Sequence, residues 1–142
     1  MNFFKKKQQI EPPDISGLKP GDAGEAWVAY LYRQKGFEIV ARNYAVYGKK
    51  KLGEIDIICA FGKRLVIVEV KTRRDERFMN ILETVNFRKQ SYLRRMAKLY
   101  LQNNPKYASY DIQIDVAAVL LDPFDNSIKS VKLIENAIED SQ

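Results

Sequence analysis

The stretch GEIDIICAFGKRLVIVEVKTR, residues 53–73, decides the fold of this chain because it contains two strongly apolar segments around a short turn. Residues 55–59 and 65–71 are rich in β-branched side chains, which is typical of strands buried inside a sheet. Residues 61–63 between them contain a glycine and predict a tight turn. The two segments are therefore expected to pair as an antiparallel hairpin.

Three charged residues interrupt this hairpin at the end far from the turn. Side chains two apart share one face of a strand, so Glu69 and Lys71 are expected to point the same way. Antiparallel pairing brings Asp56 across from them. Carboxylates among apolar residues are costly unless they are paired or bind a cation, which makes this end of the hairpin a candidate site.

Two interpretations of this site follow from the residues alone. A hard divalent cation, Mg²⁺ or Mn²⁺, prefers oxygen ligands, which Asp56, Glu69 and the Val70 carbonyl would supply. Lys71 would then orient or deprotonate a water molecule, or hold a phosphate oxygen. The alternative is a cross-strand ion pair at a sheet edge.

A helix is predicted before the hairpin, with Asp22 as its N-cap, an end near residue 35 and Gly36 as the C′ residue. Its core-facing residues are expected to be Trp27, Tyr30 and Leu31.

A second helix is predicted over residues 83–103. The sequence Asn103, Asn104 and Pro105 is expected to end it. Its expected apolar face contains Leu93, Met96, Ala97, Tyr100 and Leu101. Further strands are expected over residues 37–46, 112–121 and 128–134, and a polar loop over residues 72–82. Residues 1–20 contain three prolines and are expected to form a flexible arm before a single domain, residues 21–142.

Positive charge is concentrated just after the strand that carries Glu69. The net charge is +6, from 24 basic and 18 acidic residues. Residues 71–95 contain eight basic and three acidic residues, whereas residues 111–142 contain two lysines and seven acids. Lys49, Lys50 and Lys51 precede the other strand of the hairpin. A basic surface beside an acidic pocket suits a phosphodiester substrate, although a solvated helix face explains the helical arginines equally well.

The pattern Gly-Glu-x-Asp, followed after the hairpin by Val-Glu-Val-Lys-x-Arg, resembles the PD-(D/E)xK nuclease superfamily. More narrowly, the chain resembles the YraN-like family of small, predicted bacterial endonuclease-like proteins. Four other segments agree in order with that family, GDAGEAWVAYLYRQKGFEIVARNY, FRKQSYLRRMAKLYL, DIQIDVAAV and LIENAI. The resemblance covers roughly residues 21–138.

This resemblance implies an α/β fold of the restriction-endonuclease type, with a central mixed sheet of about five strands flanked by helices. It makes Glu25 a candidate third acid that reaches the metal directly or through water. Without the resemblance, Glu25 is explained by the helix dipole, which favours an anion in the first turn. The resemblance also places Lys89 near the site, and the alternative is a lysine that extends along the helix to solvent.

Asp115 lies among apolar residues in the predicted strand 112–121. We expect it to pair with an arginine or lysine of the second helix and to position that residue, rather than to bind metal.

Residue counts exclude several classes of site. The chain contains no histidine, which excludes Ser-His-Asp and Cys-His schemes and His-ligated zinc. Its single cysteine, Cys59, excludes an internal disulfide, suits a reducing compartment and is expected to be a packing residue. No apolar run approaches the ~20 residues that span a membrane. We therefore expect a cytoplasmic protein without a membrane partner.

The expected function is metal-dependent hydrolysis of DNA, with RNA and a homodimer left open. Glu25, Asp56, Glu69 and Lys71 would be the catalytic residues, and Arg73, Arg74 and Lys89 would contact phosphates. No base-reading motif is present, which favours recognition of nucleic-acid structure over sequence, such as branched DNA. The alternatives are a nucleic-acid-binding module that keeps the fold without turnover, and an interaction protein that docks on an acidic partner or on RNA.

Overall fold

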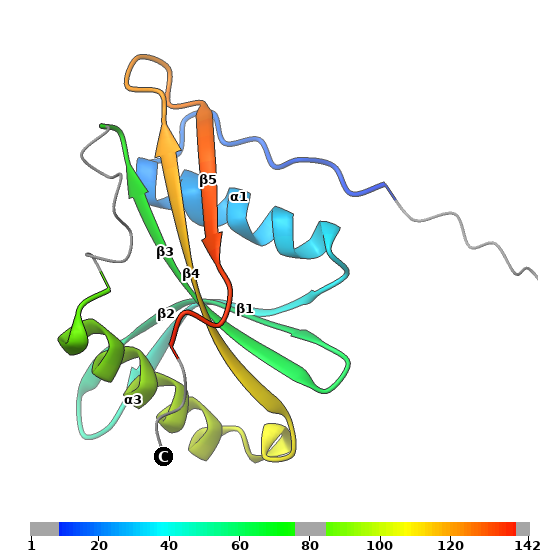
Figure 1. The fold of residues 1–142 in the computed structure, drawn as a ribbon, viewed down its shortest axis with the longest axis vertical. Helices are drawn as coiled ribbons and strands as arrows, with labels where there is room; N and C mark the ends of the chain where they lie inside the picture. Colours follow the sequence, from blue (N-terminus) through cyan, green and yellow to red (C-terminus); the bar gives the residue numbers. More distant parts are fainter. Residues whose placement is uncertain (1–8, 76–84, 139–142) are drawn as a thin grey trace, which may run out of the picture.

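The computed structural model describes residues 9–75 and 85–138, which form a five-stranded mixed sheet with one helix on each face (Figure 1). The elements are α1 (Pro20–Gln34), β1 (Glu38–Tyr47), β2 (Lys51–Phe61), β3 (Arg64–Arg73), α3 (Phe87–Asn103), the 3-10 turn η2 (Pro105–Tyr107), β4 (Asp111–Leu121) and β5 (Ile128–Ile134). The strands lie in chain order across the sheet. All neighbours are antiparallel except β3 and β4, which are parallel. The predicted α/β fold is confirmed.

The predicted hairpin is formed by β2 and β3. Its register runs from Phe61 opposite Arg64 at the turn to Ile57 opposite Val68. Gly62 in the turn has a φ of 58°, a left-handed conformation that glycine adopts without steric cost. The other predicted strands are found within two residues of their expected ends.

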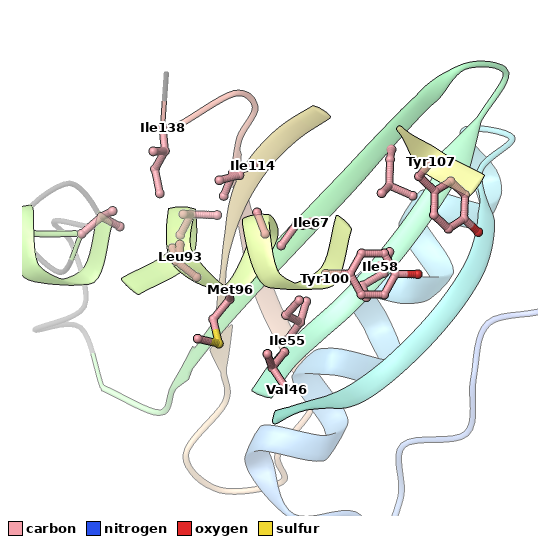
Figure 2. Packing of buried hydrophobic residues seen from close by; sticks show 14 of the residues in the cluster. Val46, Ile55, Ile58, Ile67, Leu93, Met96, Tyr100, Tyr107, Ile114 and Ile138 are labelled. Atoms are coloured by element: carbon pink, nitrogen blue, oxygen red, sulfur yellow. The ribbon is translucent and has the colours of Figure 1, made fainter. Parts of the chain in front are cut away.

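The two faces of the sheet carry separate apolar cores. On the α3 face, Leu93, Met96 and Tyr100 pack over the strands, and Figure 2 shows them in one cluster with Ile55 and Ile67. On the other face, α1 packs on alternate strand residues, which are Ile57, Cys59, Val66, Val68, Ala117 and Val119. Cys59 is fully buried, as expected of a packing residue.

The start and the buried face of α1 differ from the prediction. The helix begins at Pro20, with Lys19 as the N-cap, and Asp22 lies in the first turn without capping it. A proline suits the first helical position because its fixed φ matches the helix and its missing N–H is not needed there. Gly36 follows the helix with a φ of 96°, as predicted for a C′ glycine.

Small residues, rather than the predicted aromatic ones, face the sheet from α1. The buried residues are Ala23, Gly24, Glu25, Ala26, Val28, Ala29 and Tyr32. Trp27, Tyr30 and Leu31, the predicted core residues, are only half-buried. The cause is close packing at Gly24, where a Cβ atom would lie 2.0 Å from the Thr72 Oγ1 atom of β3.

The second helix, α3, begins later than predicted. Residues 83 and 84 lie outside the described part of the chain, but Val85 and Asn86 are not helical. Asn86 is the N-cap, and its side chain accepts a hydrogen bond from the Lys89 N–H at 2.9 Å. Four of the five predicted apolar residues are buried, and Leu101 is half-buried. The predicted loop over residues 72–82 lies mostly outside the described residues, while Thr72 and Arg73 still belong to β3.

The prediction that Asp115 pairs with a cation of the long helix is wrong. Its neighbours Ile114 and Val116 face α3, so Asp115 faces α1 on the opposite side of the sheet. There the buried carboxylate accepts hydrogen bonds from the Tyr32 hydroxyl, from the Gln113 amide at 2.8 Å and from the Asn136 N–H at 2.8 Å. Asp115 therefore has a structural role, as expected, through different partners.

Within residues 9–75 and 85–138, no helix is long and apolar enough to cross a membrane.

The close approach of α1 and β3 gives a stability prediction. Gly24→Ala places a methyl group against Thr72 and is expected to lower the free energy of unfolding by about 1–3 kcal/mol. Gly21→Ala is the matched control, because nothing lies within 4 Å of its added Cβ. It is expected to raise stability by up to ~1 kcal/mol through helix propensity. Urea unfolding of both variants measures the difference, and equal stabilities would contradict the packing argument.

Candidate functional site

The candidate residues come together where β2 and β3 separate. The β2–β3 ladder ends at Ile57 opposite Val68. Just beyond this pair, the Val70 N–H of β3 donates a hydrogen bond to the Asp56 Oδ2 atom of β2 at 2.8 Å. The Asp56 carboxylate thus lies between the two strands and satisfies a backbone donor of β3. The hairpin geometry predicted this juxtaposition of Asp56 with the end of β3.

Glu69 is buried on the α3 side of β3 and is contacted by two lysines. Its Oε1 atom lies 3.3 Å from the Lys71 Nζ atom and 2.8 Å from the Lys89 Nζ atom. Only 6% of Glu69 is exposed. The alternative of a cross-strand ion pair at a solvated sheet edge therefore does not describe Glu69. Lys89 extends from α3 toward the sheet instead of along the helix to solvent. Two cations offset much of the cost of burying this carboxylate.

Glu25 reaches the same region from α1 on the other face. It is 8% exposed and lies beside Asn43 of β1. With the amide nitrogen turned toward the carboxylate, Asn43 donates to the two Glu25 oxygens at 2.9 and 3.2 Å. Asn43 has a φ of 50°, which asparagine tolerates better than most residues.

Burial and the charge of a neighbouring carboxylate raise the pKa values of Glu25 and Asp56. The pKa of Glu25 is raised to about 7 by burial first and by the Asp56 charge second, while Arg42 opposes the shift. The pKa of Asp56 is raised to about 6 by burial and by the Glu69 charge, while the Val70 N–H opposes the shift. Glu25, Asp56 and Glu69 therefore interact as one cluster of charges, which we call the acidic cluster.

If the acidic cluster binds a divalent cation, two of its carboxylates rather than all three would contact the ion. No group of three or more His, Cys, Asp or Glu side chains within residues 9–75 and 85–138 is arranged to hold a metal ion. Mg²⁺ needs only one or two carboxylates because water completes its shell. Asp56 and Glu69 are the two carboxylates that would contact the ion, and the pKa values of Glu25 and Asp56 are raised first by burial and then by the charge of a neighbouring carboxylate.

Tyr92 of α3 supports the site and was not predicted from sequence. The Lys89 Nζ atom lies 4.7 Å from the centre of its ring, and its hydroxyl accepts a hydrogen bond from the Glu54 N–H at 3.2 Å. A Cβ atom on Gly53 would lie 2.1 Å from that hydroxyl. The glycine of the Gly-Glu-x-Asp pattern thus lets α3 approach β2. The spacing of Lys89 and Tyr92, one helical turn, was the available signal.

Asn43 was also missed, because nothing in the local sequence links a β1 residue to a carboxylate of α1.

Arg73 and Arg74, the other predicted phosphate contacts, are exposed at the end of β3. The Arg73 guanidinium donates to the Thr72 carbonyl at 2.9 Å, and that of Arg74 donates to the Pro123 carbonyl at 3.0 Å. The structure therefore directs Arg74 toward the turn after β4 rather than toward the acidic cluster.

The raised pKa values predict how stability depends on pH. Because the folded chain holds protons on Glu25 and Asp56 more tightly than the unfolded chain, stability is expected to fall as pH rises from about 4, near the ordinary pKa values of these groups, to about 7, the raised pKa of Glu25. Glu25→Gln should flatten this dependence, and Glu54→Gln, which removes an exposed carboxylate of β2, should not. Urea unfolding across this range in EDTA measures the slopes, and a flat wild-type profile would refute the prediction.

Comparison with known proteins places this site within a family. The model of the uncharacterised protein family UPF0102 matches residues 24–119, a span that includes Glu25, Asp56, Glu69, Lys71 and Lys89. A UPF0102 protein of Alkaliphilus metalliredigens is 36% identical over 117 residues, which cover 82% of this chain and 95% of the relative. One of Moorella thermoacetica is 38% identical over 117 residues, with 82% and 92% covered. The chain therefore belongs to the UPF0102 family, the YraN-like family that its motifs resemble.

Proposed function

We propose that this protein is a metal-dependent nuclease that hydrolyses phosphodiester bonds of DNA at the acidic cluster. The observation that carries this proposal is the meeting of Glu25, Asp56 and Glu69, from three different elements, beside Lys71 and Lys89. Carboxylates that raise one another's pKa are retained at a cost to stability, which is typical of functional sites.

Each residue of the site has a role in this proposal. Asp56 and Glu69 would hold Mg²⁺ or Mn²⁺, with the Val70 carbonyl as a further donor and Glu25 in contact directly or through water. Once bound, the ion would activate water and neutralise phosphate charge. Lys71, whose Nζ atom lies 3.3 Å from Glu69, would orient the attacking water and stabilise the charge on the phosphate oxygens.

Lys89 and the exposed Arg73 would contact phosphates near the scissile bond, and Arg74, which is directed toward the turn after β4, would contact a phosphate further away. Lys49, Lys50 and Lys51, all exposed around the β1–β2 turn, extend the basic surface. Contacts of this kind supply affinity without sequence selectivity.

A second function is favoured by the ion pairs of Glu69. Lys71 and Lys89 already neutralise this carboxylate, and no three acidic side chains among the described residues are arranged around one ion. A DNA-binding module that uses the site for contact alone would need no more. It predicts salt-sensitive DNA binding without metal-dependent turnover.

Substitution of the cluster separates these functions. Asp56→Asn and Glu69→Gln are expected to abolish Mg²⁺- or Mn²⁺-dependent cleavage of labelled DNA, a loss of at least about 100-fold, because each removes a charge on which the chemistry depends. Glu54→Gln is the matched control, because Glu54 lies two residues from Asp56 on the exposed side of β2 and pairs with Lys51. The assay is gel-resolved cleavage over duplex, single-stranded and branched substrates, with circular dichroism to verify folding.

Metal binding is measured in parallel by titration calorimetry. Site-specific binding that Asp56→Asn removes and Glu54→Gln retains would support the nuclease. DNA binding by the wild type without cleavage at any substrate or metal would support the module instead.

A further inference from the structure

Phe87, the first residue of α3, exposes an aromatic ring to solvent. It is 80% exposed, and no aromatic ring among the described residues packs against it. Phe61, another exposed phenylalanine, differs because its ring lies 5.6 Å from that of Phe37. Within residues 9–75 and 85–138, the Phe87 ring therefore has no aromatic partner and is mostly exposed.

The backbone around Phe87 is held in place. Val85 is buried in the core under α3, and its carbonyl accepts a hydrogen bond from the Gln90 amide at 3.0 Å. Asn86 caps the helix through the Lys89 N–H. A ring on such a fixed backbone presents a flat apolar surface at low entropic cost to a ligand.

The charges around Phe87 indicate what that ligand is. Helix α3 contains five basic residues and no acidic residue. Arg88, Arg95 and Lys98 are exposed along it, over about 15 Å of helix at 1.5 Å per residue. Lys89, two residues after Phe87, contacts Glu69 of the cluster. An exposed ring among cations is the combination that binds unpaired nucleotides, the ring by stacking on bases and the cations by contacting phosphates.

We infer that Phe87 stacks on an unpaired base while the exposed cations of α3 contact phosphates, so that the protein takes nucleic acid with a single-stranded segment in preference to uninterrupted duplex. This inference deepens the proposed function, on which it rests for the chemistry at the acidic cluster. In a continuous duplex the base faces are already stacked on one another, so the ring has nothing to bind there.

Metal-free binding tests the inference independently of cleavage. Fluorescence anisotropy in EDTA would compare a labelled single-stranded oligonucleotide of thymidines with a duplex of equal length, at fixed salt. Phe87→Ala is expected to weaken single-strand binding about tenfold, as the loss of one stacked base predicts, and to change duplex binding little. Phe87→Trp should restore the affinity.

Phe124→Ala is the matched control. Phe124 is 96% exposed on the turn after β4, at the opposite end of the molecule from α3 (Figure 1), so its removal should leave both affinities unchanged. Equal single-strand binding by wild type and Phe87→Ala, or an equal loss in Phe124→Ala, would overturn the inference. Absence of cleavage together with a Phe87-dependent single-strand preference would refute the nuclease and leave the stacking role intact.

Discussion

The buried carboxylate of Glu69 is the constraint on which this site depends. A charge at that depth is stable only with partners, and the chain supplies Lys71 from the same strand and Lys89 from α3. Lys89 is in turn held over the Tyr92 ring, and Tyr92 lies against Gly53 of β2. The need to neutralise one side chain thus links β3, α3 and β2 around the acidic cluster.

Glu25 and Lys89 approach from opposite faces of the sheet, which a continuous ladder would keep apart. They approach one cluster because β2 and β3 stop pairing after Ile57 and Val68, and Asp56 occupies the gap. The separation of two strands therefore makes a site that both helices can reach. The same geometry explains the raised pKa values, because carboxylates from both faces share a partly dry space.

The predictions from sequence failed where packing between elements decided the outcome. The aromatic residues of α1 were expected in the core, but close contact at Gly24 turns its small residues inward. Asp115 was assigned a partner on α3, but strand alternation turns it toward Tyr32. Asn43 and Tyr92 were missed because each acts on a residue distant in the chain. In each case the partner belongs to another element and is not specified by the local sequence alone.

The sequence by itself determined the hairpin, the shared face of Glu69 and Lys71, and the position of Asp56 opposite them. These features follow from strand alternation and a two-residue turn, which are local properties. The motifs of the sequence also determined the family. The sequence also determined where positive charge gathers. Only the tertiary structure decided that Lys89 reaches Glu69 and that Asn43 holds Glu25. The physical reason is that side-chain partners across elements depend on how closely the helices approach the sheet, and single glycines at positions 24 and 53 control that distance.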